Sequence, residues 1–384
     1  RAVVNANPWE QRKLGDLVDR VTRKNQDLVS ELPLTISAQY GLIDQNEFFD
    51  KRVASKDVSG YYLIENGEFA YNKSTSTDAP WGAIKRLDRY ENGVLSTLYI
   101  VFGIKENNPV DSDFLVSYYN TNLWHKGIHE IAAEGARNHG LLNIAPADFF
   151  ETKLMIPQDI EEQKKIGKYF EELERLITLH QRKCDEVKSL KKYMLQKMFP
   201  QNEQKVPEIR FEGFTEAWEQ RKLGDVAQEF KSGNSLKADE IDITGDYPVY
   251  GGNGLRGYTS TYNHDGEYAL IGRQGALCGN MNYSAGKAYF TEHAVVVKAD
   301  ENNVTRFLYY MLDTMNLGQY SDQSAQPGLA VNKLVKLENS FPKKEEQQQI
   351  GAYFRSLDHL ITLHQQKCEE LKKIKKFMLQ KMFV

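Results

Sequence analysis

The chain has 384 residues, a formal net charge of −4 and a hydrophobic content of 41%, enough for two or three folded domains. No run approaches the ~18 apolar residues that a membrane helix needs, and the first residues lack a secretory signal pattern. The slightly acidic charge argues against indiscriminate binding of polyanions. Three cysteines argue against a disulfide framework and favour a cytoplasmic location.

Residues 1–157 are expected to form a first globular domain with mixed helices and strands. The phrase WEQRKLGD stands near its start, at residues 9–16. Residues 113–125 predict a short helix, and residues 149–157 form a hydrophobic stretch that ends in a proline.

Residues 158–199 predict one long helix. Apolar residues recur there at alternating spacings of four and three, which is the heptad period of a coiled coil. Asp159 and Glu162 resemble a capping box at the start, and Pro200 ends the helix. At ~1.5 Å per residue, about 40 residues extend about 60 Å. The predicted core of this helix consists of Phe170, Leu173 and Ile177.

Residues 200–217 are polar and irregular and predict a linker, and residues 218–341 predict a second domain. The phrase WEQRKLGD returns unchanged at residues 218–225, but most of the second domain does not match the first. Short strands joined by glycine turns are predicted at residues 251–258, 267–275 and 287–298, and a helix at 305–315. This helix shares FL and YY with residues 113–125, so one interpretation is a common fold with diverged surfaces.

Residues 342–384 predict a second long helix that repeats the first. Between residues 166–199 and 350–383, 23 of the 34 aligned positions are identical. Its predicted core residues are Phe354, Leu357 and Ile361. Each helix has an apolar seam that needs a matching partner, and its repeat supplies one. Because each helix follows its own domain, we expect a pseudo-twofold repeat with an antiparallel pair. The fold class is therefore α/β (α+β): two mixed domains separated by a long antiparallel two-helix coiled coil.

Lysines gather in the last turns of both predicted helices. One interpretation is a favourable position against the negative end of the helix dipole. The other is contact with an acidic partner or with phosphate. The lysines concerned are Lys188, Lys191, Lys192 and Lys197 in the first helix, and Lys372, Lys373, Lys375, Lys376 and Lys381 in the second.

No catalytic arrangement stands out in the sequence. Residues 252–257, GNGLRG, match a dinucleotide-binding fingerprint by letters, but no helix is predicted after them, so a turn-rich β segment is favoured. There is no nucleophile elbow, no phosphate-binding loop and no Asn-Pro-Pro-aromatic tetrapeptide. We therefore predict a non-catalytic chain, with no catalytic residues.

A histidine and a cysteine lie one helical turn apart in each repeat: His180 with Cys184, and His364 with Cys368. In an antiparallel pair all four could meet, and they are ligand types that zinc favours. The alternative is seam histidines with small buried thiols. Because the usual loop spacing of zinc sites is absent, we predict no metal site.

The two domains carry aromatic residues interleaved with amide, hydroxyl and basic side chains. Arg, Asn and Gln pair bidentately with guanine and adenine edges, and Lys contacts phosphates. Two such clusters on one chain favour binding of duplex DNA. The candidates are Gln39, Tyr40, Asn72, Lys73, Lys85, Arg86, Arg137 and Asn138 in the first domain, and Lys231, Asn234, Asn253, Arg256, Arg273 and Gln274 in the second.

The repeated phrases carry a resemblance to a known family. The most specific are LITLHQRKCDEVKSLKKYMLQKMF with its second copy LITLHQQKCEELKKIKKFMLQKMF, followed by WEQRKLGD, PEIRFEGF and YPVYGGNGLRGY. Together they resemble the specificity subunit of a type I restriction–modification system, over nearly the whole chain.

The resemblance implies that each domain reads one half of a bipartite, asymmetric DNA site, with the helix pair fixing the unread gap. Two modification subunits would methylate adenine with S-adenosylmethionine. Two restriction subunits would use ATP and Mg for translocation and cleavage. The chain itself would hold no cofactor.

Two other functions are open from the residues alone. The chain would also suit a two-headed adaptor that binds two proteins. A stand-alone enzyme using the glycine-rich part of the second domain is the third reading.

Overall fold

The computed structural model describes residues 9–37, 40–51, 53–77, 79–106, 110–132, 140–201, 204–321 and 328–383. The chain divides into two compact units. The first comprises Arg1–Leu179 with Lys367–Val384, and the second His180–Gln366. Within the described ranges, no helix combines the length and apolar character required to cross a membrane.

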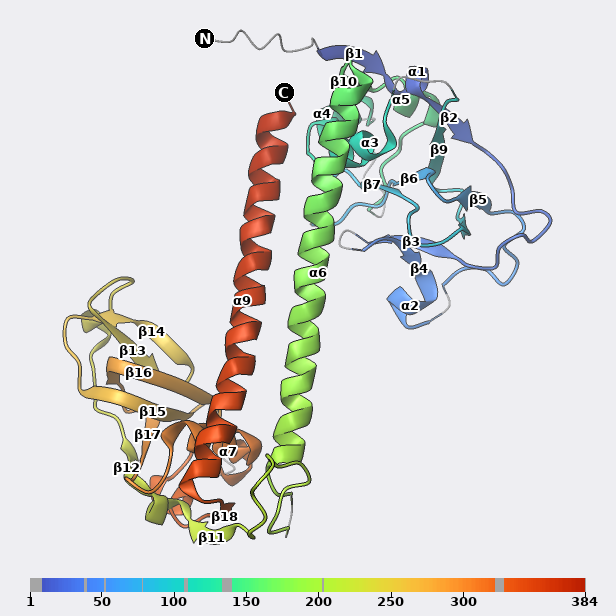
Figure 1. Cartoon of the computed structure of the whole chain (residues 1–384). Helices are drawn as coiled ribbons and strands as arrows, with labels where there is room; N and C mark the ends of the chain where they lie inside the picture. The colour runs from blue at the N-terminus through green and yellow to red at the C-terminus, as the bar shows by residue number, and fades with distance from the viewer. Residues whose placement is uncertain are drawn as a thin grey trace. The chain divides into compact units, whose positions relative to one another are not determined.

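Two long helices, α6 (Ile160–Met198) and α9 (Lys344–Met382), each contribute one half to each unit. In the first unit the end of α9 packs antiparallel along the start of α6 (Figure 1). The predicted core residues Phe170, Leu173 and Ile177 are all buried there, against Cys368, Leu371 and Phe383.

In the second unit the pairing is repeated with the roles of the helices exchanged. The start of α9 packs against the end of α6, and the buried core includes Phe354, Leu357, Met198 and Phe199. The sequence prediction of two antiparallel helices with a heptad seam is thus confirmed inside each unit. Ile361 departs from it because its side chain is only half-buried.

The domain of the first unit is built on a four-stranded antiparallel sheet, in the order β2-β9-β6-β7. Helix α3 (Ser112–Tyr119) packs beside this sheet, and its Phe114 and Leu115 are completely buried. The strands are β2 (Val18–Val21), β9 (Ile100–Ile104), β6 (Phe69–Asn72) and β7 (Ala83–Arg86).

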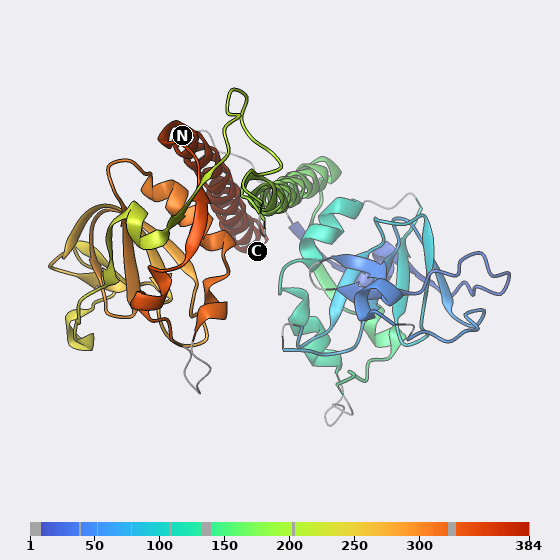
Figure 2. The same ribbon diagram turned by 90° about the horizontal axis from the view of Figure 1, so that it is seen from below.

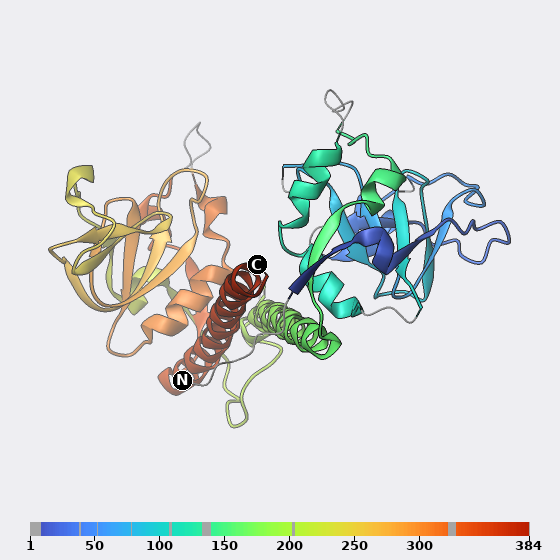
Figure 3. The same ribbon diagram turned by 90° about the horizontal axis from the view of Figure 1, so that it is seen from above.

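Smaller elements surround this sheet. Strand β1 (Trp9–Lys13) pairs antiparallel with β10 (Lys153–Pro157), which leads into α6 (Figure 3). Two further antiparallel pairs are β3 (Leu34–Ser37) with β4 (Gly41–Asp44), and β5 (Tyr62–Glu65) with β8 (Asn92–Leu95). The short helices are α1 (Leu14–Leu17), α2 (Gln45–Phe49), α4 (Trp124–Ile131) and α5 (Pro146–Phe150).

The second unit holds a six-stranded sheet in the order β12-β17-β15-β16-β13-β14. Helix α7 (Thr305–Thr314) packs against the β15–β16–β17 part of this sheet (Figure 2). The strands are β12 (Ala227–Ser232), β13 (Tyr247–Gly251), β14 (Gly254–Thr259), β15 (His264–Gly272), β16 (Met281–Phe290) and β17 (Ala294–Ala299).

Strand β11 (Glu219–Lys222) pairs with β18 (Glu338–Phe341) in the second unit, as β1 pairs with β10 in the first. The remaining elements are η1 (Leu223–Val226), η2 (Ala238–Glu240), η3 (Leu317–Tyr320) and α8 (Val331–Leu334).

The two domains share a fold. The order β12-β17-β15-β16 repeats β2-β9-β6-β7, with antiparallel pairing at every step. Individual hydrogen bonds repeat as well. The backbone N–H of Leu142 donates to the carbonyl of Lys73 at 3.0 Å, and that of Leu329 to Arg273 at 2.9 Å. The interpretation of a common fold with diverged surfaces is therefore confirmed.

Several predicted elements need correction. The strand predicted at 251–258 is a hairpin of β13 and β14, and the one at 287–298 divides between β16 and β17. The helix predicted at 113–125 divides into α3 and α4, because Asn120 and Thr121 favour local turn hydrogen bonds over a continuing helix. The predicted linker also packs: the ring of Phe211 lies 6.0 Å from that of Tyr353.

A glycine at equivalent places of the two long helices gives a matched test of packing. A Cβ on Gly167 would lie 2.7 Å from the backbone N of Phe114, whereas a Cβ on Gly351 would have its nearest neighbour at 3.5 Å, the N of Phe307. We expect Gly167→Ala to lower the free energy of unfolding by about 1–3 kcal/mol. Gly351→Ala should be neutral or stabilising by up to ~1 kcal/mol, because alanine favours helix.

Urea unfolding followed by circular dichroism measures both effects. Equal midpoints for the two variants would contradict the close approach of α6 to α3.

Candidate nucleic-acid interface

Four loops meet at one end of the sheet in the second unit, and we call them the loop cluster. Backbone hydrogen bonds join these loops to one another and to the adjoining strand ends: Arg273 donates to His293 at 2.9 Å, Thr291 to Tyr250 at 2.9 Å, and Asn234 to Phe290 at 3.0 Å. The loop cluster comprises residues 232–235, 251–254, 272–280 and 291–294. Segments that are far apart in the sequence thus form one surface.

Glycines make this close packing of backbones feasible. A Cβ on Gly272 would lie 2.4 Å from the carbonyl oxygen of Gly252, so only glycine fits where the two loops touch. Gly254 has φ +93°, a left-handed conformation that follows the exposed Asn253 at the hairpin turn. The letters of the dinucleotide fingerprint therefore encode a β-hairpin, as favoured from the sequence.

The predicted residues of the second domain gather at the loop cluster. Asn253 and Arg256 are exposed on the hairpin, and Gln274 is exposed on the loop after β15, where its Oε1 lies 3.1 Å from Nδ1 of His293. Arg273 is half-buried, and its Nη1 donates to the carbonyl of Glu292 at 3.4 Å. Four of the side chains named from sequence thus share one surface.

Lys231 and Asn234 lie at the border of the same surface. Asn234 forms a bridge with Thr291. The Nζ of Lys231 lies 3.0 Å from Glu229 while its side chain stays 61% exposed. The carboxylate of Glu229 is only 19% exposed and also lies 2.9 Å from Nε2 of His264.

Sequence reasoning missed one polar residue of the loop cluster, His293, which contacts Gln274. It stands between β16 and β17, which the sequence did not separate correctly. Asn282, at the start of β16, lies beside the cluster: its Oδ1 is 2.9 Å from where a Cβ on Gly254 would stand.

In the first unit, Asn72 and Lys73 stand at the corresponding place. Asn72 is the last residue of β6 and Lys73 follows it, as Arg273 follows β15, and the bridge of Ser74 with Leu141 matches that of Gln274 with Gly328. Burial, and next the charge of Arg20, lower the pKa of Lys73. Arg20, which sequence reasoning missed, therefore adds positive charge at this loop end.

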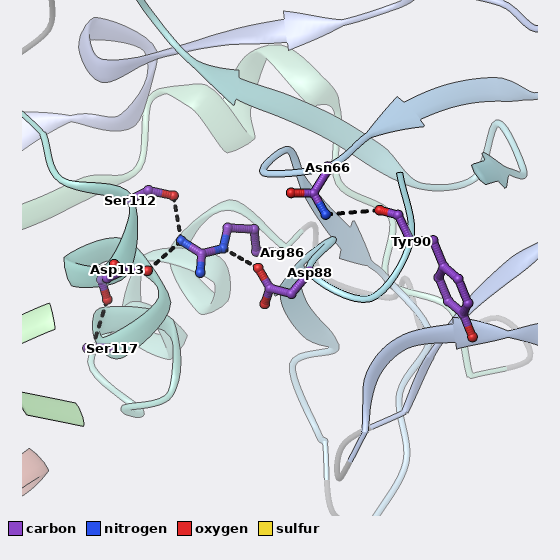
Figure 4. A network of polar contacts seen from close by, with 7 residues as sticks. All are labelled: Asn66, Arg86, Asp88, Tyr90, Ser112, Asp113 and Ser117. Carbon is purple, nitrogen blue, oxygen red and sulfur yellow. Dashed lines mark hydrogen bonds and ion pairs between the residues drawn. The ribbon is translucent and has the colours of Figure 1, made fainter. Parts of the chain in front are cut away.

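Arg86 is engaged inside its own domain (Figure 4). Its Nε donates to Asp88 at 2.6 Å, and its Nη1 contacts Ser112 and Asp113, both at 2.7 Å. The guanidinium thereby joins β7 to α3 between two carboxylates, and its side chain is 16% exposed. We therefore assign Arg86 a structural role and leave it out of the proposed DNA-contacting set.

Of the other candidates in the first domain, the structure describes Lys85 and Tyr40. Lys85 lies within β7, where its Nζ donates to Asn120 Oδ1 at 2.9 Å. Tyr40 is 56% exposed, beside the turn between β3 and β4. Gln39, Arg137 and Asn138 lie outside the described residues.

The seam histidines meet, and both belong to the second unit. Nδ1 of His180 lies 3.0 Å from Nδ1 of His364, and the Sγ of Cys184 is 4.0 Å from the carbonyl oxygen of Ile361. Over the ranges the structure describes, no three or more His, Cys, Asp or Glu side chains are placed to hold a metal ion. The side chains instead pack as parts of the helix seam.

Comparison with known proteins adds to this geometry. Residues 7–189 and 215–373 match the family model described as the type I restriction modification DNA specificity domain. The chain belongs to this family. The family membership confirms the resemblance found in the sequence, and the two matched ranges correspond to its two repeated halves.

Two curated specificity subunits are similar over part of the chain. The type I restriction enzyme EcoprrI specificity subunit of Escherichia coli is 51% identical over 114 residues, 30% of this chain and 28% of the relative. A putative type I restriction enzyme specificity subunit of Haemophilus influenzae is 27% identical over 142 residues, 36% of each protein. The matched part thus spans well under half of each relative's length.

The fold of the whole chain is also found in a solved structure. The crystal structure of the S subunit of a type I restriction–modification system from M. genitalium has a TM-score of 0.71 and 18% sequence identity. The similarity covers 100% of this chain and 98% of that one. The two chains therefore share a fold although most of their residues differ.

Proposed function

We propose that this chain is a DNA-specificity subunit that recognises a bipartite, asymmetric DNA site, one half with each domain. A single observation carries the proposal. The two domains repeat one strand order and its hydrogen bonds, yet present different side chains at the equivalent loop ends. One scaffold with two unlike surfaces suits two unlike half-sites.

The side chains of the loop cluster support direct reading of bases. Arg256 offers a guanidinium, which pairs bidentately with guanine, and Asn253 and Gln274 offer amides, which pair bidentately with adenine. All three are exposed, Asn253 and Gln274 on short, glycine-packed loops and Arg256 on the adjoining strand β14. In the first domain, Asn72, Lys73 and Arg20 provide the corresponding loop-end surface.

Methylation and restriction are proposed to be performed by other subunits of the complex. We propose two modification subunits, which bind S-adenosylmethionine and methylate adenine, and two restriction subunits, which use ATP and Mg. This chain contributes the choice of site, and the gap between half-sites is set by its helix pair. A chain with net charge −4 suits this division, since partners then supply much of the phosphate contact.

Mapping of methylated adenines tests this function. The complex carrying Arg256→Ala and Gln274→Ala is expected to lose discrimination in one half-site only, by about 1–3 kcal/mol for each bidentate pair. Lys192→Ala, on a long helix, is the control and should leave both half-sites unchanged. Relaxation of both half-sites, or of neither, would contradict the assignment of one half-site to each domain.

The two-headed protein adaptor is the alternative function. A salt titration of DNA affinity distinguishes the adaptor from the DNA-specificity subunit. Contacts to DNA phosphates make the logarithm of the DNA affinity fall linearly with the logarithm of the salt concentration. DNA affinity that is unaffected by salt would favour the adaptor.

A further inference from the structure

A groove of about 830 Å³ lies within the first unit, between its domain and the long helices. The last turns of α9 form one side, and β7 with the segment between α3 and α4 forms the other. Its floor is apolar and fixed. Trp124 is 8% exposed and its Nε1 donates to Thr121 O at 2.9 Å, while the ring of Phe383 packs 5.5 Å from that of Phe114.

The rim of this groove carries four lysines. Lys375 is paired with Glu174, and Lys372 lies 3.1 Å from Glu369. For Lys85 and Lys376, no carboxylate lies within ion-pair distance among the residues that the structure describes. Burial, and next the charge of Lys375, lower the pKa of Lys85. The groove therefore has an excess of positive charge that the first unit does not neutralise.

The second unit shows that the repeated helix alone does not produce this excess. Lys191 and Lys192 occupy the positions of Lys375 and Lys376 in the repeat. There, Lys191 pairs with Asp358 at 2.6 Å, as Lys375 pairs with the equivalent Glu174 in the first unit. The difference is Asp313, a carboxylate in the place of Asn120 on which the charge of Lys191 also acts. The second domain faces its helix lysines with an acid where the first presents an amide and Lys85.

We propose that the groove of the first unit binds an acidic, amphipathic segment of a partner protein. Its carboxylates would pair with Lys85 and Lys376, and its apolar side chains would cover Leu379 and the indole of Trp124. This inference is separate from the recognition of DNA by the loop cluster. Of the two interpretations of the helix lysines, it favours contact with an acidic partner for Lys376 of α9.

Duplex DNA fits this groove less well than an acidic peptide. The lysines surround an apolar floor, and a phosphate backbone offers nothing to bury against that floor. Lys85 is half-buried between β7 and α3, where it bonds Asn120, so a ligand must reach inward to it. A flexible glutamate side chain can do so, whereas the phosphates of a duplex are fixed on a stiff helix.

Fluorescence anisotropy of the full chain with a labelled peptide of Glu-Glu-Leu-Leu repeats tests the proposal. We expect saturable binding, with at least about tenfold weaker affinity for a peptide carrying Gln in place of Glu. The double variant Lys85→Gln with Lys376→Gln should also lose at least about tenfold. Lys192→Gln, the second-unit counterpart of Lys376→Gln, should bind as the parent does.

A second variant changes the charge of the groove without removing a lysine. Asn120→Asp gives the first unit the carboxylate of the second, and it should weaken the acidic peptide while the thermal midpoint of the protein stays unchanged. Equal binding by parent and double variant, or no binding at all, would overturn the proposal. The proposal would also be overturned if a DNA duplex of unrelated sequence displaced the peptide, and if the double variant weakened DNA binding by the same factor as peptide binding. Half-site recognition by the loop cluster is measured separately, by mapping methylated adenines, and its outcome does not depend on the peptide-binding result.

Discussion

Replacing Arg210 with Ala is expected to lower the free energy of unfolding of the second unit by about 3–5 kcal/mol. Arg210 donates from Nε and Nη2 to the two oxygens of Glu346, at 2.8 and 2.7 Å. The side chains are 12% and 2% exposed, so this is a buried bidentate ion pair. Its removal leaves an unpaired carboxylate in the interior, which costs far more than an exposed pair contributes.

Lys343→Ala is the matched control for this prediction. Lys343 pairs with Glu216 at 2.7 Å in the same region, but both side chains are 68% exposed, so the loss should stay below ~1 kcal/mol. The double replacement Arg210→Met with Glu346→Gln should recover much of the stability, because no charge then remains buried. Urea unfolding measures all three. An Arg210→Ala effect no larger than that of Lys343→Ala would refute the argument.

Replacing Phe354 with Ala is expected to destabilise the second unit by a similar amount, about 3–5 kcal/mol. Phe354 is fully buried at the start of α9, and its ring lies 5.1 Å from that of Tyr310 and 5.9 Å from that of Phe199. The substitution removes an aromatic side chain and leaves a cavity where α6, α7 and α9 meet.

The same helix supplies the control for Phe354. Phe377 is 57% exposed, so Phe377→Ala should change the free energy of unfolding by no more than ~0.5 kcal/mol. Thermal and urea unfolding of the two variants measure the difference. Similar losses in both would mean that the seam does not contribute as its burial indicates.

The long helices could be predicted well because their signal is local and repeated. Phe170, Leu173 and Phe354 follow a heptad period over many turns, and a buried seam needs that period. Short elements were harder. The chain reverses at Asn253 within a run of strand-like residues, and α3 ends at Asn120 within a run of helical ones. Such breaks depend on one or two residues.

Of the candidate site, the sequence supplied residue types but not their neighbours. Arg273 and Gln274 do stand on one surface with Asn253, because loops distant in the sequence pack through glycine backbones. Arg86 has the same chemistry as Arg256, yet two carboxylates from its own domain surround it. The residue type is the same for the arginine proposed to read bases and for the structural one, and only their surroundings differ.

The repeated phrase WEQRKLGD shows the same limit. In its first copy, Trp9 Nε1 donates to Glu162 at 3.1 Å. In the second, Arg210 takes both oxygens of the equivalent Glu346, and Trp218 Nε1 has no hydrogen-bond partner among the residues described. Identical sequences thus acquire different bonds, because a residue outside the repeat competes for the acceptor.

By itself, the sequence determined the duplication, the two long helices, their apolar seam and the family, since all of these depend on periodicity and identity along the chain. Tertiary structure alone decided which polar residues form a surface, which are neutralised, and which lysines remain without an acid. Those outcomes depend on distances between segments that are remote in the sequence. Charge and hydrogen bonding act over a few ångströms in space, whatever the separation along the chain.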